Sequence, residues 1–215
     1  DEGKGKGTTV PLGPGGDDLP LDAEAAIMRL LDEIETLRVE LDANKRRIAY
    51  LENLADRDPL TPVVNRRAFI RELERAKSYA ERYGGAASLI FFDLDGMKAL
   101  NDAHGHACGD RALMVVAETL IANVRASDVV GRLGGDEFGV ILAQADTAAA
   151  KEKAVDLAET IASAQIDTDD DQITLSASWG VVELGTTRDA AHAMECADQA
   201  MYAQKRANHD RPAAD

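Results

Sequence analysis

The sequence predicts an α+β fold, in which a mostly antiparallel sheet is flanked by helices and is preceded by one long helix. Three observations support this prediction. Short apolar runs alternate with amphipathic helical stretches between about residues 58 and 207. Apolar residues recur every seventh position between residues 27 and 51. Two adjacent glycines and two adjacent acids, residues 134–137, separate two apolar runs, which is the pattern of a hairpin turn.

Composition narrows the possible class of protein. The chain has 215 residues, of which 45% are hydrophobic, enough for one domain and an accessory segment. Two cysteines, Cys108 and Cys196, make neither a disulfide framework nor a zinc motif and fit a reducing cytoplasm. A net charge of −15 argues against nucleic acid and anionic membrane as partners. Because no long apolar run or leader is present, we expect a soluble cytoplasmic protein without direct membrane contact.

The segment 22–56 has the heptad pattern of a parallel two-stranded coiled coil. Residues 1–21 before it are rich in Gly and Pro, and we expect a flexible tail there. Branched residues at a with Leu at d favour two parallel strands, and one buried Asn fixes their register. The a positions are Ile27, Ile34, Leu41 and Ile48, and the d positions are Leu30, Leu37, Asn44 and Leu51.

Charges beside this seam support pairing with a second copy. In a parallel dimer each g residue faces the e residue five places on in its partner, and the three resulting pairs are all of opposite sign. A helix that packs its stripe on its own domain, the alternative, predicts no such pattern. We therefore expect a homodimer through residues 27–51. The pairs are Glu33 with Arg38, Glu40 with Lys45, and Arg47 with Glu52.

The remaining pattern predicts a mixed domain over 57–211, followed by a short tail at 212–215. Its element order describes a ferredoxin-like sheet with helices on one face. The predicted helices cover 66–83, 110–124, 147–165 and 189–207, and the predicted strands cover 87–92 and 173–182, with the hairpin around Gly134 between them.

The turn Gly134-Gly135-Asp136-Glu137 has the composition of a metal and phosphate site. Glycine permits a positive φ and a close approach of the backbone to a ligand. Carboxylate oxygens suit Mg²⁺, which completes its coordination with phosphates and water. A nucleoside triphosphate is therefore the expected ligand, and an exposed acidic turn is the alternative.

A second acidic position, Asp93, ends the first predicted strand just before a short helix, whose N-terminus can bind phosphate. If the sheet places this strand end beside the hairpin, Asp93 and Asp136 can share one or two metal ions. Such a pair resembles a two-metal nucleotidyl-transfer site. Taken alone, Asp93 is equally a helix cap or a solvated side chain.

Asn101 and Asp110 indicate which base such a site would take. An ionised carboxylate only accepts hydrogen bonds, so it can receive both the N1–H and the N2–H of guanine, whereas adenine has no proton on N1. This chemistry selects guanine.

Together these residues resemble the GGDEF family of diguanylate cyclases over about residues 57–211. The matching motifs occur in the family's order and spacing. They are Asp58-Pro59-Leu60-Thr61, Asn65-Arg66-Arg67, Asp93-Leu94-Asp95 with Lys98, Asn101-Asp102, Gly105-His106, Gly109-Asp110, Gly134-Gly135-Asp136-Glu137-Phe138, and Ala197-Asp198 with Ala200-Met201-Tyr202 and Lys205.

The resemblance implies a palm-like relative of nucleotide cyclases that condenses two GTP into cyclic di-GMP and pyrophosphate, with Mg²⁺ or Mn²⁺. It also implies a role for each matching position. Asp136 and Glu137 would be catalytic and would bind metal with Asp93 and the carbonyl of Leu94; Gly134 and Gly135 would approach the phosphates; Asn101 and Asp110 would bind guanine; Lys98 and Lys205 would neutralise the triphosphate.

Two further positions bear on regulation and affinity. Arg125 and Asp128 form an RxxD motif five residues before Gly134, where family members carry a product-inhibition site for cyclic di-GMP. His209 stands where the family has a phosphate-binding arginine, so GTP binding is expected to be weaker unless Arg206 or Arg211 substitutes.

The reaction implied by the resemblance needs two copies of the chain. The 3′-OH of one nucleotide attacks the α-phosphorus of the other across a two-fold axis, so dimerisation is part of the active site. The group that removes the 3′-OH proton stays open among Glu137, Asp136 and a metal-bound hydroxide. A catalytically silent receptor for cyclic di-GMP or GTP, or a scaffold, is the alternative function.

Overall fold

The structure, a computed structural model, describes residues 9–10, 19–167 and 172–209. The chain divides into two compact units, residues 1–55 and 56–215. In the first unit, strands β1 (Thr9–Val10) and β2 (Leu19–Pro20) pair antiparallel, and helix α1 (Leu21–Asp56) follows. Most of the predicted flexible tail, and all of the tail at 212–215, lie outside the described residues.

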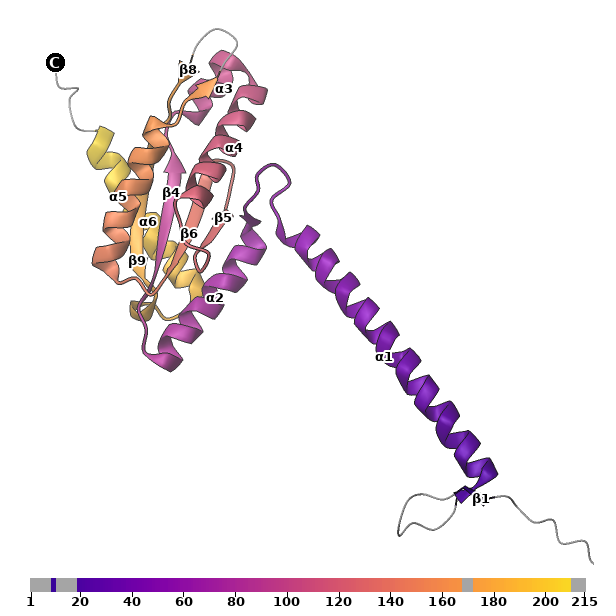
Figure 1. The fold of residues 1–215 in the computed structure, drawn as a ribbon. Coiled ribbons are helices and arrows are strands. Elements are labelled where there is room, and N and C mark those ends of the chain that lie inside the picture. Colours follow the sequence, from indigo (N-terminus) through magenta and orange to yellow (C-terminus); the bar gives the residue numbers. More distant parts are fainter. Residues whose placement is uncertain (1–8, 11–18, 168–171, 210–215) are drawn as a thin grey trace, which may run out of the picture. The chain divides into compact units, whose positions relative to one another are not determined.

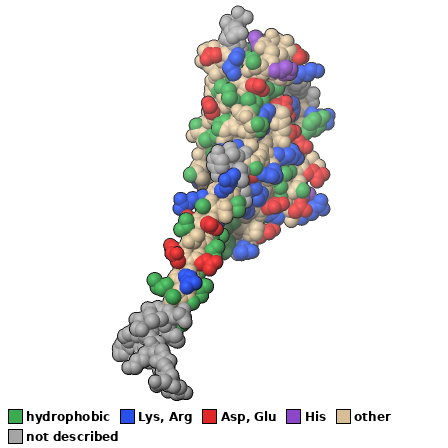
Figure 2. Space-filling view, turned by 90° about the vertical axis from the view of Figure 1, so that its right-hand side faces the viewer, with side chains coloured by type: hydrophobic (Ala, Val, Ile, Leu, Met, Phe, Trp, Pro, Cys, Tyr) green, Lys and Arg blue, Asp and Glu red, His purple; other side chains and the backbone are tan. Residues whose placement is uncertain are grey.

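Helix α1 covers the predicted stalk. Its 36 residues contain neither Gly nor Pro and span about 54 Å at 1.5 Å per residue. The apolar seam is open to a partner, since Ile27 is 43% exposed and Leu37 56%, and hydrophobic side chains of α1 are visible at the surface in Figure 2. Val39, which lies off the seam, is 63% exposed. The coiled coil itself stays a prediction.

The second unit is built on a five-stranded sheet in the order β3-β5-β6-β4-β9 (Figure 1). The short strand β3 pairs parallel with β5, and the other pairs are antiparallel, which confirms the predicted mostly antiparallel sheet. The bounds are β3 Val64–Asn65, β4 Ala87–Leu94, β5 Val129–Arg132, β6 Glu137–Ala143 and β9 Ala177–Glu183.

Helices cover both faces of this sheet, so the expectation of helices on one face is wrong (Figure 1). Along β4, Leu89 and Phe91 belong to a core with α2 and α6, whereas Ile90 and Phe92 belong to a core with α4 and α5. The physical reason is visible in the unbroken apolar run 89–92, because a strand with consecutive apolar residues is buried on both sides. The helices are α2 Arg66–Tyr83, α3 Met97–His104, α4 His106–Ala122, α5 Thr147–Ser163 and α6 Ala190–His209.

Two elements differ from prediction by more than a few residues. Helix α4 begins at His106 and not at Asp110, because Gly105, with a φ of +79°, is the residue that separates it from α3. The single strand predicted over 173–182 is instead two strands, β8 (Gln172–Ile173), which pairs with β7 (Ile166–Asp167), and β9. A single 3₁₀ turn, η1 (Leu184–Thr186), leads from β9 toward α6.

Two glycines bring α2 unusually close to the sheet. Gly131 on β5 and Gly139 on β6 face each other in register. A Cβ atom at either position would lie 2.5 Å from the ring of Phe69, which fills the space in their place. The close approach positions the first turn of α2 over the hairpin between β5 and β6. No helix within the described part of the chain is long and apolar enough to cross a membrane.

Candidate active site

The acidic hairpin lies beside the end of β4, as the sequence predicts. Asp93 on β4 stands opposite Glu137 on β6 in the antiparallel register, and the Leu94 amide donates a hydrogen bond of 3.1 Å to the Asp136 carbonyl. Since alternate residues of a strand share a face, both Asp93 and Glu137 project to the α2 and α6 side, with Phe91. The two carboxylates therefore end neighbouring strands on the same face.

Gly134 acts by close approach, not by an unusual backbone angle. The described glycines with a positive φ are Gly84, Gly96 and Gly105, so neither Gly134 nor Gly135 uses the positive φ that glycine permits. A Cβ atom on Gly134 would lie 2.2 Å from Oε2 of Glu137, whereas one on Gly135 would meet no heavy atom within 4 Å. Gly134 thus leaves room for the Glu137 carboxylate to fold against the turn.

Glu137 carries an unfavourable charge in this environment. Burial raises its pKa above the ordinary value, against the opposing charge of Arg66. The neighbouring carboxylates Asp136, Asp93 and Asp198 raise it further. A set of acids that repel one another is the electrostatic setting in which a bound cation is stabilising.

The positive charge nearest to these acids is Lys205 on α6. Its ammonium group contacts the Asp93 carboxylate and lies 3.3 Å from Asp95. Burial alone would lower the pKa of Lys205, but the hydrogen bonds and charges of Asp93 and Asp95 raise it above its ordinary value. In the part of the chain that is described, no three Asp, Glu, His or Cys residues are grouped closely enough to hold a metal ion. The oxygens of Asp93, Asp136 and Glu137 still fit a divalent cation, because carboxylates are hard ligands. The ion pair with Lys205 shows that a positive charge is already accommodated beside Asp93.

Asp95 has a role that the sequence pattern did not assign. Its carboxylate accepts hydrogen bonds from the hydroxyls of Ser176 at 3.0 Å and Ser178 at 3.1 Å, and it is an ion-pair partner of Lys205. Asp95 therefore orients Lys205 beside Asp93. The signal was the alternation Asp93-Leu94-Asp95 at a strand end, but the serines that hold Asp95 come from a distant segment.

The predicted nucleotide-binding residues lie on α3 and α4, which pack against each other. Oδ1 of Asn101 is buried and accepts no hydrogen bond from any described residue. A buried acceptor without a donor is costly, so it favours a ligand that brings an N–H group. Asp110 is exposed on α4. Lys98, in the first turn of α3, is exposed and makes no ion pair with the rest of the described chain.

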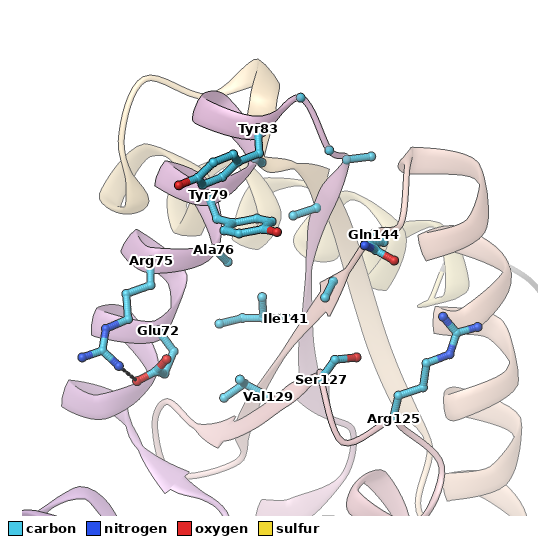
Figure 3. Close-up of a pocket in the computed structure, with 16 residues that line it drawn as sticks. Glu72, Arg75, Ala76, Tyr79, Tyr83, Arg125, Ser127, Val129, Ile141 and Gln144 are labelled. Carbon is cyan, nitrogen blue, oxygen red and sulfur yellow. Dashed lines mark hydrogen bonds and ion pairs between the residues drawn. The ribbon is translucent and has the colours of Figure 1, made fainter.

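The predicted product site has a different construction. The Asp128 carboxylate accepts hydrogen bonds from the amides of Arg125 at 2.9 Å and Ala143 at 3.1 Å, so it is already engaged in holding the turn. The Arg125 side chain is exposed and has no partner among the described residues. Arg125 borders a cavity of about 660 Å³ with an apolar floor that includes Ile141 (Figure 3).

Aromatic side chains of α2 line the opposite side of this cavity. Tyr79 and Tyr83 are exposed, and their ring centroids are 4.8 Å apart. In Figure 3 both rings lie above the apolar floor, while the Arg125 guanidinium points away from them. The side chain of His209 and all of Arg211 fall outside what is described, so the expectation of weaker GTP binding stays a prediction.

Two arginines that the sequence reasoning missed hold the backbone of the acidic turn. Nη1 of Arg66 donates to the Leu133 carbonyl at 2.9 Å, and the guanidinium of Arg132 donates to the Gly135 carbonyl. Arg66 belongs to a matched motif, but nothing in the local pattern indicates that it contacts a residue 67 positions away.

Comparison with known proteins identifies the second unit. The family model for the diguanylate cyclase GGDEF domain matches residues 55–211. The chain belongs to this family. The chain is 35% identical over 178 residues to diguanylate cyclase DgcS of Shewanella oneidensis, and the matched region covers 81% of this chain and 58% of the relative.

Solved structures agree with the assignment. A sensory box/GGDEF family protein from Caulobacter crescentus superposes with a TM-score of 0.67 at 35% identity, over 71% of this chain and 99% of that one. The coiled coil and GGDEF domain of DgcB from Caulobacter crescentus, solved in complex with c-di-GMP, superposes with a TM-score of 0.67 at 28% identity, over 86% of this chain and 95% of that one. The chain spans 58% or less of the first curated relatives that it matches.

Proposed function

We propose that this GGDEF domain is a diguanylate cyclase that condenses two GTP into cyclic di-GMP and releases two pyrophosphates. The observation that carries the proposal is the opposition of Asp93 and Glu137 across the β4–β6 ladder, next to a two-glycine turn. Burial, and to a smaller extent the neighbouring carboxylates, raise the pKa of Glu137, so this cluster favours a bound positive charge. The curated relatives named as diguanylate cyclases support the same reaction.

Each part of the site supplies one element of that reaction. Asn101 and Asp110 bind the guanine edge, and Lys98 attracts the triphosphate. The 3′-OH oxygen of one nucleotide bonds to the α-phosphorus of the other, the bond from that phosphorus to the oxygen bridging to the β-phosphate breaks, and pyrophosphate leaves. The hydroxyl proton passes to a base, for which Glu137 and Asp136 are the candidates in the chain. The same reaction between the remaining 3′-OH and α-phosphorus closes the ring and releases the second pyrophosphate.

A divalent cation, Mg²⁺ or Mn²⁺, would be held by Asp93, Asp136, Glu137 and the carbonyl of Leu94. When bound, it stabilises negative charge on the reacting phosphate oxygens. Lys205 already pairs with Asp93, so a bound cation would share the Asp93 carboxylate with that ammonium group or displace it.

The direct test is incubation of the purified chain with GTP and Mg²⁺, followed by chromatography for the cyclic dinucleotide. We expect cyclic di-GMP and pyrophosphate, and no product with ATP. A folded chain that binds GTP or cyclic di-GMP but forms no product would contradict the cyclase and favour the silent receptor.

Base selection depends on the Asp110 carboxylate. We expect Asp110→Asn to lower the preference for GTP over ATP by about 10–100-fold, because the amide cannot accept from both guanine N–H groups as the carboxylate does. Competition of the two nucleotides in the turnover assay measures this ratio. A strict preference for GTP in the variant would assign base selection to another group.

Dimerisation through residues 27–51 brings two half-sites together. The seam of α1 is half exposed and flanked by complementary charges, which suits a second copy of the helix. A tether of this kind gives an effective concentration on the order of mM. At sub-micromolar enzyme we therefore expect Leu37→Glu to lower the rate per domain by up to about 10³-fold.

The matched control for the seam is Val39→Glu, which adds the same charge to the same helix off the seam. We expect it to leave both the rate and the dimer unchanged. Sedimentation velocity should show a monomer for Leu37→Glu and a dimer for Val39→Glu. Equal behaviour of the two variants would exclude the predicted seam.

Product inhibition is the remaining part of the proposal. The Arg125 guanidinium, without a partner among the described residues, stands at the rim of the cavity between α2 and β6. Its fork of donors fits the guanine or phosphate edges of cyclic di-GMP.

A further inference from the structure

The backbone of the acidic turn is clamped at two carbonyl oxygens. Nε and Nη2 of Arg132 donate to the Gly135 carbonyl at 3.2 and 2.7 Å, and Nη1 of Arg66 donates to the Leu133 carbonyl at 2.9 Å. These two carbonyls flank Gly134. Two further hydrogen bonds close the turn, from the Leu133 amide to the Glu137 carbonyl and from the Leu94 amide to the Asp136 carbonyl.

Arg132 is in turn held by Asp58. Its Nη1 lies 3.3 Å from Oδ1 of Asp58, and the two side chains are only 15% and 12% exposed. Oδ1 of Asp58 also accepts from the Thr61 amide at 2.8 Å and the Thr61 hydroxyl at 2.7 Å. The planar guanidinium therefore uses Nε and Nη2 on the turn and Nη1 on Asp58, so its orientation is determined from both sides.

Electrostatics agree with this geometry. Burial alone would raise the pKa of Asp58, but the Thr61 hydrogen bonds and the Arg132 charge hold it below its ordinary value. Asp58 is therefore ionised at neutral pH, the state that an arginine partner requires. A half-buried pair with hydrogen bonds on both members is held more firmly than a surface ion pair.

We propose that Arg132, held by Asp58, is a positioning residue that sets the backbone of the catalytic turn and thereby the places of Asp136 and Glu137. The inference rests on the proposed function of that turn. Arg132 reaches the Gly135 carbonyl and acts on the carboxylates through the backbone. Arg132 and Asp58 are 74 positions apart, so their contact joins the segment that enters the domain, Asp58 to Thr61, to the turn.

A neighbouring aspartate provides a matched control. Asp56 is also paired with arginines, through Arg71 at 2.6 Å and Arg67 at 3.2 Å, and both of these partners belong to α2. Asp56→Asn and Asp58→Asn remove the same charge two residues apart. Asp58→Asn retains Oδ1 as an acceptor for Thr61, so the entry turn is preserved.

The first measurement is hydrogen exchange of the Leu133 and Leu94 amides in the chain without nucleotide. We expect Arg132→Gln to speed exchange at both amides about tenfold, because the charged donors on the Gly135 carbonyl are lost. Asp58→Asn should speed it less, about threefold. Arg132→Lys should recover part of the loss, since lysine keeps the charge beside Asp58 but cannot supply two coplanar donors. Asp56→Asn should leave both amides unchanged.

The second measurement separates turnover from binding. We expect Arg132→Gln to lower kcat about 10–100-fold while KM for GTP changes less than about twofold, since the guanine-binding residues lie on other elements. In the Arg132→Gln background, Asp58→Asn should have no further effect, because the two residues act in series.

Clear outcomes would overturn the proposal. Exchange at Leu133 and Leu94 that is unchanged in both Arg132→Gln and Asp58→Asn would exclude it, as would equal effects of Asp56→Asn and Asp58→Asn. Should Arg132→Gln not fold, Arg132→Lys and Asp58→Asn decide the same question. Exchange requires no turnover, so an inert wild-type chain would contradict the cyclase while leaving the positioning role decided by exchange.

Discussion

Two turns of the same sheet, one at each end of β5, are held in place in different ways. The turn at 125–128 is held by its own residue, because the Asp128 carboxylate accepts from the Arg125 and Ala143 amides. The turn at 133–137 is closed by the Leu133 amide bonded to the Glu137 carbonyl and is held in addition by arginines outside it, which donate to the carbonyls of Leu133 and Gly135. A self-contained turn leaves its arginine available to a ligand, whereas an externally clamped turn leaves its carboxylates available for chemistry.

The difference also predicts how each turn responds to change. The outer clamp makes the turn at 133–137 depend on residues far away in the chain, so substitutions elsewhere should alter turnover. The turn at 125–128 depends on its own four residues and one strand, so the proposed product site there should be separable from catalysis. Three experiments test this contrast.

The largest effect is expected at the catalytic turn itself. Asp136→Asn should lower cyclic di-GMP synthesis by about 10³-fold, because it removes a carboxylate from the group that would hold the divalent cation beside the reacting phosphates. Product formation from GTP and Mg²⁺ measures it, and circular dichroism checks the fold. The control is Glu118→Gln, an exposed acid of α4, which should leave the rate unchanged. Substantial turnover by Asp136→Asn would move the chemistry away from this turn.

An intermediate effect is expected at the product turn. Arg125→Ala should raise the cyclic di-GMP concentration that halves the rate by about tenfold, because the fork of donors is lost, while the initial rate stays the same. Progress curves with added product measure both values. Arg188→Ala, at an arginine that is 76% exposed, serves as the control. Loss of the initial rate in Arg125→Ala would show that the two turns are not separable.

The smallest effect concerns stability and pH. Because the folded chain raises the pKa of Glu137 above its unfolded value, this residue binds its proton more tightly when folded. Its contribution therefore improves as pH falls through the raised pKa and is unfavourable at neutral pH. Without divalent cations, Glu137→Gln should melt about 1 °C higher than wild type at pH 7, and the difference should vanish near pH 4.

Added Mg²⁺ sharpens this measurement. A cation held by Glu137 favours the charged form, so millimolar Mg²⁺ should raise the melting temperature of wild type more than that of Glu137→Gln. Calorimetry with and without the ion decides it. Equal shifts in the two proteins would remove Glu137 from the metal-binding group.

Local features of the fold could be predicted from the sequence. Helix α2 has the predicted bounds because Asn65 caps its first turn by accepting from the Ala68 amide and Gly84 ends its last turn. Both residues lie next to the helix in the sequence. The apolar run of β4, the hairpin and the family motifs are equally local. The wrong start predicted for α4 also has a local cause. The single residue Gly105 separates α3 from α4, so α4 begins before Asp110.

The sequence by itself determined the type of the main helices and of the central strands, the family, and the identity of the acids. Tertiary structure decided that helices cover both faces of the sheet, that Asp93 opposes Glu137, and that Arg132 connects Asp58 to Gly135. The physical reason is range. Periodicity and capping reflect interactions between residues a few positions apart, whereas strand register and the reach of an arginine depend on how segments many positions apart pack into one core.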